Sequence, residues 1–273
     1  MSLSTEIERA ADLIRHSRHV IAFTGAGHST PSGIPDFRSP NSGLWEKDNP
    51  MLVASIWAFR LNPRSFYDWI RPLMDVMLDA RPNLAHKALA NLEQMGYLRT
   101  VITQNIDNLH QRAGSRRVLE LHGHMREATC IRCYKETPID PGLEEMVRQG
   151  QVPRCSCGGV LKPNVILFGE QLPIRVFNKA VEEAKHCDLI LVVGSSLTVA
   201  PAADIPFMAV EAGARAIIVN LQPTDFDPLA NVVIRGDLVE AVPSIVEAVA
   251  AADTAPAGAK HPDEGNIEES LAR

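Results

Sequence analysis

The 273-residue chain lacks an excess of basic residues, a long apolar run and a high aromatic content. Its net charge of -6 gives no basic footprint, so we expect no nucleic-acid partner. No apolar run reaches the length of a membrane span, and none is expected to enter a membrane. The N-terminal segment MSLSTEIERAADLIRHSR resembles an amphipathic helix, with Thr5 and Glu8 as its predicted capping box, rather than a signal peptide. We therefore expect a cytoplasmic monomer.

Cysteines are few, and four of the five lie between residues 126 and 162. A C-x-x-C pair is followed after 21 residues by a C-x-C pair, which is typical of a structural zinc site with four thiolates. The alternative is four unrelated buried thiols. Cys187 begins an apolar run and is interpreted as a core thiol. The predicted zinc ligands are Cys130, Cys133, Cys155 and Cys157.

Short apolar runs alternate with helical patterns at 84–96 and 174–186. This alternation predicts an α/β fold with a Rossmann-like, doubly wound parallel sheet. We expect that domain over 1–125 and 163–251, a helical insertion at about 36–81, a small zinc-binding domain over 126–162 and a disordered tail from 252 to 273. The predicted strands are 19–24, 98–103, 117–121, 164–168, 188–194 and 215–220.

The loop after the first strand lacks the third glycine of G-x-G-x-x-G, because Thr30 stands in its place. An acidic residue at the end of a second strand, which a dehydrogenase needs for the adenosine ribose, is also missing. Gly25 and Gly27 can still bring backbone N–H groups close to a pyrophosphate. Thr30 before Pro31 predicts a short helical turn. A nucleotide such as NAD is therefore expected, without hydride transfer.

Polar residues follow nearly every predicted strand, where ligands bind in open α/β sheets. Asn105, Asp107, His110 and His122 each lie within a few residues of a strand end. The alternative to a binding site is that these residues are polar only because surface loops generally are. A second strand-to-helix turn, Gly194-Ser195-Ser196, offers hydroxyls to a ribose or phosphate.

Seven motifs together resemble, in order and spacing, the sirtuin family of NAD-dependent protein-lysine deacylases. The match covers about residues 5–250 and is most similar to bacterial and archaeal deacetylases. The resemblance implies a cleft between the two domains that admits NAD from one side and an acetyl-lysine peptide from the other. The motifs are GAGHSTPSGIPDFRSP, TQNIDNLHQRAG, LELHGH, the two cysteine pairs, KPNVILFGE, GSSLTVAPAA and VNLQPTD.

The resemblance also implies roles for individual residues. His122 would be the catalytic base, with Asn105 as a second catalytic residue, and Asp107 would accept a hydrogen bond from the nicotinamide amide. The peptide would pair as an added strand near Val165, Phe168 and Gly169. The implied NAD contacts are Gly25, Ala26, Gly27, Thr30, Asp36, Phe37, Arg38, Gln104, Asn105, Ile106, Asp107, His122, Gly194, Ser195, Ser196, Asn220, Leu221, Asp237 and Leu238.

The implied reaction transfers the acetyl group to ADP-ribose and releases nicotinamide, O-acetyl-ADP-ribose and deacetylated protein. Family members that prefer succinyl or malonyl groups carry Tyr-x-x-Arg, whereas here Arg71 comes one position late after Tyr67. That shift rotates the guanidinium by about 100° around a helix, which predicts an apolar pocket and acetyl preference.

Three further histidines are given no part in catalysis or binding. His28 is expected to face solvent and receives no role, while His110 and His124 are interpreted as structural. Two other function classes stay open: a zinc-ribbon binding module on an α/β scaffold, and an NAD hydrolase or ADP-ribosyltransferase. Nicotinamide release without an acyl-lysine peptide would favour the last of these.

Overall fold

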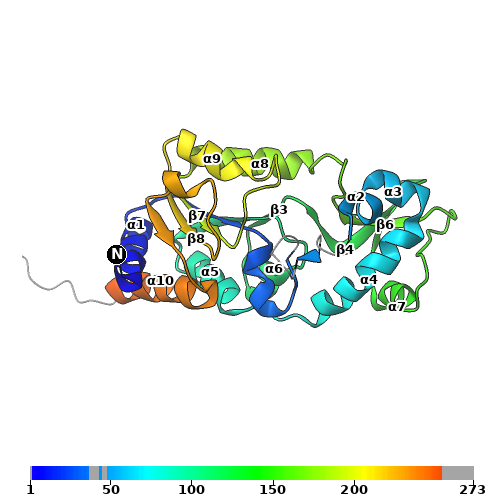
Figure 1. Ribbon diagram of the computed structural model, residues 1–273, viewed down its shortest axis with the longest axis horizontal. Coiled ribbons are helices and arrows are strands. Elements are labelled where there is room, and N and C mark those ends of the chain that lie inside the picture. Colours follow the sequence, from blue (N-terminus) through cyan, green and yellow to red (C-terminus); the bar gives the residue numbers. More distant parts are fainter. Residues whose placement is uncertain (1, 37–42, 45–47, 254–273) are drawn as a thin grey trace, which may run out of the picture.

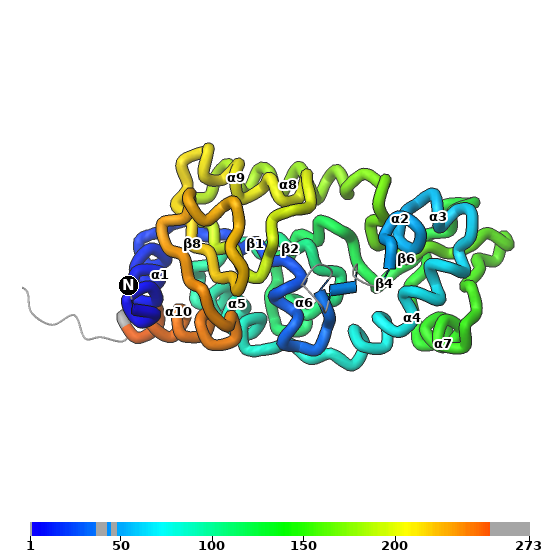
Figure 2. The backbone as a smooth tube through the Cα atoms, viewed as in Figure 1, coloured from blue at the N-terminus to red at the C-terminus, as the bar shows by residue number. Residues whose placement is uncertain are grey.

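The structure, a computed structural model, describes residues 2–36, 43–44 and 48–253. It is elongated, with a large sheet and its helices at one end and a small sheet with a group of helices at the other (Figures 1 and 2). The chain crosses between the two ends several times, so each is built from separated stretches of sequence.

The large sheet has six parallel strands in the order β3-β2-β1-β7-β8-β9. This order reverses between β1 and β7, which makes their carboxyl ends the switch point where such sheets bind ligands. The predicted Rossmann-like, doubly wound sheet is confirmed. The strands are β1 (Val20–Thr24), β2 (Leu98–Thr103), β3 (Val118–Glu120), β7 (Leu189–Val193), β8 (Arg215–Val219) and β9 (Val232–Ile234).

Helices cover both faces of this sheet (Figure 1). One face packs against α1 (Leu3–Arg15), α5 (Leu84–Gln94) and α10 (Leu238–Asp253). The other packs against α8 (Ile174–His186) and α9 (Asp204–Glu211). Because side chains alternate across a strand, consecutive residues of β7 supply both buried clusters, which explains its continuous apolar sequence.

The small end combines an antiparallel sheet, in the order β5-β4-β6, with four helices. Its apolar residues form a third buried cluster that includes both the helices and the sheet. The hydroxyl of Tyr67 donates to the carbonyl oxygen of Leu161 at 2.6 Å and joins α4 to β6. The elements are α2 (Pro50–Val53), α3 (Ile56–Leu61), α4 (Pro63–Asp79), β4 (Gly123–Cys130), β5 (Glu136–Pro138), α7 (Pro141–Arg148) and β6 (Leu161–Val165).

Three local expectations were wrong. The first helix is capped by Ser2, whose side chain accepts from the N–H of Thr5, so Thr5 is not its N-cap. The strand expected at 164–168 shares only Asn164 and Val165 with the observed strand β6, which pairs with β4 in the small sheet and not with the parallel sheet. The list of expected strands was also incomplete, because β4, β5 and β9 were not expected.

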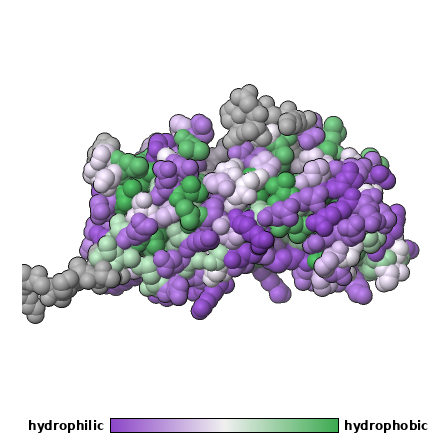
Figure 3. All heavy atoms as spheres, turned by 90° about the horizontal axis from the view of Figure 1, so that it is seen from below, coloured by the Kyte–Doolittle hydropathy of each residue, from purple (hydrophilic) through white to green (hydrophobic). Residues whose placement is uncertain are grey.

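None of the helices within the described ranges is long and apolar enough to cross a membrane. Figure 3 shows hydrophilic side chains predominating toward the end that carries α4 and α7, with apolar groups scattered elsewhere. Helix α10 extends to Asp253, and the remainder of the tail expected to be disordered lies outside the described residues.

Candidate functional site

Two glycine turns meet at the switch point. Gly25 follows β1 and donates its N–H to the carbonyl of Val193, the last residue of β7. A Cβ at Gly27 would lie 2.9 Å from the carbonyl oxygen of Gly194. Gly194 has φ +63, and its own Cβ would lie 2.4 Å from the N–H nitrogen of His28. Only glycines allow the two turns to approach this closely. The N–H groups of Gly25 and Gly194 donate to the carbonyls of Val193 and Val219, so these two bonds hold the turns to the strand ends.

Replacing Gly27 with alanine is expected to raise the KM for NAD by about 10- to 100-fold, which corresponds to ~1–3 kcal/mol of overpacking. The added methyl pushes on backbone atoms, which cannot rotate away as a side chain can. The matched control is Gly33→Ala, because Gly33 has φ +90 but open space around it. That change costs about 1–2 kcal/mol of stability without moving the glycine pair. Equal KM values for both variants would contradict the steric explanation.

A chain of hydrogen bonds follows β2. The Asn105 amide donates to the carbonyl of Gly25 and to the Ser29 hydroxyl, each at 3.0 Å. Ser29 in turn donates to the Asp107 carboxylate at 2.6 Å. Ser29 was not among the predicted contacts, although the neighbouring Thr30 was. Its position between Gly27 and Thr30, two predicted NAD contacts, could have indicated it. This chain of hydrogen bonds fixes Asn105 and Asp107 against the cofactor loop, the segment after β1 that contains Gly25, Gly27 and Ser29.

Asp107 is held in a buried position. Burial raises the pKa of its carboxyl group, while hydrogen bonds from the Ser29 hydroxyl and the Leu109 N–H oppose that rise. An acceptor that is already fixed and largely desolvated can recognise an amide N–H without reorganising.

His122 lies between β3 and β4, where the chain passes from the large sheet to the small one. Its Nδ1 is 3.0 Å from the carbonyl oxygen of Gln104. A carbonyl only accepts, so Nδ1 carries the proton and Nε2 holds the lone pair of the neutral ring. Gln104 is itself anchored, since its amide donates to the Ser195 hydroxyl at 2.8 Å. These contacts orient His122 as a proton acceptor.

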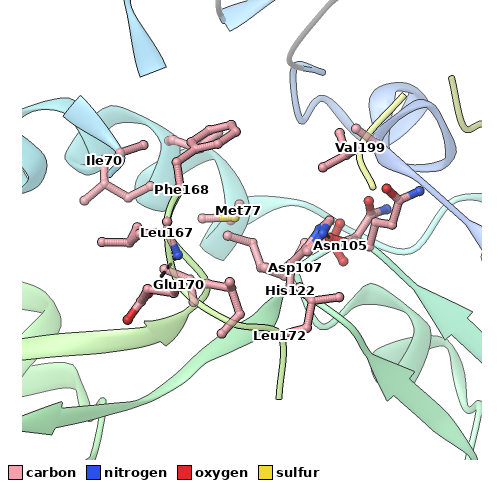
Figure 4. Close-up of a pocket in the computed structure, with 18 of the residues that line it drawn as sticks. Ile70, Met77, Asn105, Asp107, His122, Leu167, Phe168, Glu170, Leu172 and Val199 are labelled. Atoms are coloured by element: carbon pink, nitrogen blue, oxygen red, sulfur yellow. Dashed lines mark hydrogen bonds between the residues drawn. The ribbon is translucent and has the colours of Figure 1, made fainter. Parts of the chain in front are cut away.

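A cavity of about 630 Å³ opens beside these groups. In Figure 4, Asn105, Asp107 and His122 gather at one end, and Ile70, Leu167 and Phe168 lie toward the other. Much of the apolar wall comes from one stripe of α4 with helical spacing. This stripe comprises Phe66, Trp69, Ile70, Leu73 and Met77. The site thus joins a polar catalytic end to an apolar pocket.

Val165, Phe168 and Gly169, the expected peptide contacts, all line the cavity. The N–H of Phe168 already donates to Ala54, and its carbonyl accepts from Ile56. An added strand therefore cannot use the backbone of Phe168 without breaking these bonds, whereas the side chains remain at the cavity wall.

The expected adenosine contacts lie apart from the cavity, after β8 and β9. The Asn220 amide donates to the carbonyl of Gln222, and Leu221 is exposed. Asp237 accepts from the N–H of Val239 at the start of α10. The Leu238 side chain is in the core, so only its backbone can face a ligand.

The other expected NAD contacts divide into four groups. Ala26, Gln104 and Ile106 line the cavity. Thr30 donates to the carbonyl of Gly27, and Ser196 is exposed beside Thr198. The carbonyl of Asp36 accepts from Leu44. Phe37 and Arg38 lie outside the described residues.

The four predicted zinc ligands form one cluster, with all their sulfur atoms within 4.8 Å of one another. The closest pairs are 3.5 and 3.7 Å apart, near the ~3.8 Å expected for tetrahedral zinc with Zn–S bonds of about 2.3 Å. The N–H of Cys157 is the main cause that lowers the pKa of Cys155 to about 6. A Cβ at Gly159 would lie 2.5 Å from the Cys130 sulfur. This set fits a closed structural zinc site.

The expectation that His28 faces solvent was wrong. His28 is fully buried and its ring lies 4.4 Å from that of His86 and 5.0 Å from that of His110, centroid to centroid. Sequence reasoning could not find this group, because its members are far apart in the chain and His86 lies in none of the seven motifs. Burial lowers the pKa of all three imidazoles, so the rings are neutral.

Residues 25–201 match the family model described as the Sir2 family. An NAD-dependent protein deacylase 2 of Archaeoglobus fulgidus is 51% identical over 249 residues, covering 90% of this chain and 97% of that protein. An NAD-dependent protein deacetylase of Sulfurisphaera tokodaii is 48% identical over 242 residues, covering 89% and 95%. The solved structure of Sir2Af2 bound to a myristoylated histone peptide superposes with a TM-score of 0.79 at 45% identity, covering 92% of this chain and 99% of that one.

The family model covers more than half of the chain, and the relatives match it over nearly their whole length. The matched range also contains both glycine turns, His122 and the cysteine cluster. On both grounds, the chain belongs to the Sir2 family.

Proposed function

We propose that this chain is a protein-lysine deacetylase that uses NAD as co-substrate and His122 as its general base. As a member of the Sir2 family, it is an NAD-dependent protein deacylase. Acetyl-lysine, NAD and water are converted to lysine, nicotinamide and O-acetyl-ADP-ribose. The observation that carries the proposal is an oriented imidazole at the junction of a polar pocket and an apolar cavity.

NAD supplies a nicotinamide leaving group and the ribose that accepts the acetyl group. The first glycine turn offers the backbone N–H groups of Ala26 and Gly27 to the pyrophosphate, and Asp107 accepts from the nicotinamide amide. Asn105 orients reacting groups from its fixed place beside Ser29. The proposed NAD contacts are Gly25, Ala26, Gly27, Thr30, Asp36, Phe37, Arg38, Gln104, Asn105, Ile106, Asp107, His122, Gly194, Ser195, Ser196, Asn220, Leu221, Asp237 and Leu238.

His122 acts by removing a proton from a ribose hydroxyl. Its Nε2 is the basic atom, because Nδ1–H is held by the Gln104 carbonyl. A neutral imidazole is well suited to this task near neutral pH. The zinc at Cys130, Cys133, Cys155 and Cys157 holds the small sheet and takes no part in proton transfer.

The acyl group is proposed to occupy the apolar cavity. No Lys or Arg lines it among the residues that the structure describes. The Tyr67 hydroxyl is already used by Leu161, and Arg71 lies 3.6 Å from Asp68. Neither residue is a cavity-lining one, so this pair cannot clamp a carboxylate there.

The size of the cavity and the stripe on α4 favour a second candidate function, the removal of long acyl chains. The apolar part of the cavity, walled by five side chains of α4, offers more surface than a methyl group can cover, and burying more CH₂ groups contributes about 0.8 kcal/mol each. One solved relative binds a myristoylated histone peptide, which is consistent with this candidate.

Three peptides of one sequence, carrying acetyl-, myristoyl- or succinyl-lysine, test the acyl choice. We expect the first two to be converted and kcat/KM for the succinyl peptide to be at least about 100-fold lower, because an unpaired buried carboxylate costs several kcal/mol. Initial rates measured by mass spectrometry at saturating NAD give the comparison. A succinyl rate above the acetyl rate would contradict the proposed pocket.

We assign the peptide to the cavity wall formed by Val165, Phe168 and Gly169, and the substrates to acetyl-lysine-containing proteins. A cytoplasmic monomer without a nucleic-acid partner, and the predicted domain boundaries, belong to the same proposal. The test is incubation of an acetyl-lysine peptide with NAD and the purified chain. Unchanged peptide would overturn the deacetylase assignment, and nicotinamide release without peptide would favour an NAD hydrolase.

A further inference from the structure

The buried group formed by His28, His86 and His110 has no role in the proposed reaction. Their exposed fractions are 0%, 0% and 1%, and none of them lines the catalytic cavity. One ring nitrogen from each lies within 4.8 Å of those from the other two. The histidines come from three elements: the turn Ala26–His28, α5 and α6 (Leu109–Ala113).

Five of the six ring nitrogens have no hydrogen-bond partner among the described residues. A buried polar atom without a partner typically lowers folding stability by ~1–3 kcal/mol. Five such atoms in one group are therefore unusual for a protein core. Fully buried imidazole nitrogens without hydrogen-bond partners offer the lone pairs that metal ions bind.

The sixth nitrogen fixes which atom His110 presents. Thr24 donates its hydroxyl proton to Thr103, so the Thr24 oxygen must accept from Nε2 of His110 at 2.9 Å. His110 therefore carries its proton on Nε2 and its lone pair on Nδ1, one of the atoms without a partner. In a metal-binding histidine, the ring nitrogen that does not bind the metal usually donates a hydrogen bond to a neighbouring group, as Nε2 of His110 does here.

Asn83 holds the other two histidines in place. Its side-chain oxygen accepts from the N–H of His86, and its amide donates to the carbonyl of His28 at 2.8 Å. Both backbones are thus tied to one side chain, independently of the rings. The arrangement is fixed before any ion arrives, which lowers the entropic cost of binding.

We propose that His28, His86 and His110 form a second metal site, distinct from the cysteine cluster, for a divalent transition-metal ion such as Zn²⁺. Imidazole nitrogen is a preferred ligand of Zn²⁺ and Co²⁺, and three histidines leave a fourth position for a water-derived ligand. The ring nitrogens, within 4.8 Å of one another, would move closer on binding to reach the ~3.4 Å separation of tetrahedral zinc. Because His28 adjoins Gly27 and Ser29, a bound ion would fasten the cofactor loop to α5 and α6.

The test uses the full-length chain expressed with Co²⁺ in the medium. Metal analysis is expected to find a second ion per chain beyond the one held by the thiolates. The visible spectrum is expected to contain weak nitrogen-ligand d–d bands in addition to strong thiolate charge-transfer bands. His28→Leu fills similar space without a ligand atom, and it should remove the second ion and the weak bands while keeping the thiolate bands.

His124→Leu is the matched control and should keep both ions, because His124 lies outside the group. Retention of the second ion in His28→Leu would overturn the proposal. So would a single ion per wild-type chain at saturating Co²⁺, which would mean that ordered water satisfies the rings. This wild-type measurement decides the matter even if His28→Leu does not fold, and neither result depends on deacetylase activity.

Discussion

Replacing His122 with alanine is expected to lower the rate of deacetylated-peptide formation by about 10²- to 10⁴-fold, the usual contribution of a general base. The Nε2 lone pair is lost, and the methyl group left behind makes no contact with the Gln104 carbonyl. Nicotinamide release should fall less than formation of free lysine, because the base acts on the later proton transfer. Mass spectrometry of peptide and nicotinamide in the same reaction measures both rates.

The matched control is His124→Ala. His124 is in the same strand region, is also partly buried, and lines neither the cavity nor the cofactor loop. Comparable losses in both variants would mean that removing either histidine of the 122–124 segment impairs the enzyme through its fold. Loss confined to His122→Ala, with an unchanged thermal unfolding profile, would establish the proton-accepting role.

Replacing Cys130 and Cys133 together with alanine is expected to remove one zinc ion per chain and to abolish activity. Structural zinc contributes about 10–16 kcal/mol in small zinc-finger peptides, so β4 and β6 should lose their protection from hydrogen exchange. Activity should be lost as well, because the N–H of Ile166 donates to the carbonyl of His122 and links the small sheet to the base. Metal analysis, hydrogen exchange and the peptide assay together check this.

Cys187→Ala provides the control for thiol loss. Cys187 is buried beside α8, far in sequence from the cysteine pairs, and its Sγ donates to the carbonyl of Ala184. This variant should keep its zinc and its activity, with only a modest loss of stability from a small cavity. Full activity in the double variant that lacks the thiolate-bound zinc would show that the cluster does not support the site.

The parallel sheet could be predicted because its strands are buried on both faces and read as continuous apolar runs. β7 (LILVV) is the clearest example. β4 (GHMREATC) was missed because it has no such run, and only its pairing with β5 and β6 makes it a strand. β6 (LKPNV) was placed too late because the apolar run at 165–168 lies mostly beyond its end. Its pairing was also missed, since hydrophobicity does not encode which sheet a strand joins.

The candidate site divides in the same way. Gly25, Asn105 and His122 could be predicted because ligands bind at strand ends, and each residue lies beside one. The hydrogen bonds of Ser29 depend on a loop folding back onto β2, and the approach of His28 to His86 depends on how α5 packs. Distances of this kind are set by tertiary structure and leave no local pattern.

The cluster shared by α4 and the small sheet has a consequence for synthesis of the chain. α4 is complete at Asp79, but β6, which accepts the hydroxyl of Tyr67 and covers part of its apolar face, emerges only at Leu161–Val165. Between them, the ribosome adds strands and helices that belong to the other end of the molecule. Until β6 has been synthesised, the apolar face of α4 lacks the strand that covers part of it. During that interval the nascent chain can bind chaperones or aggregate.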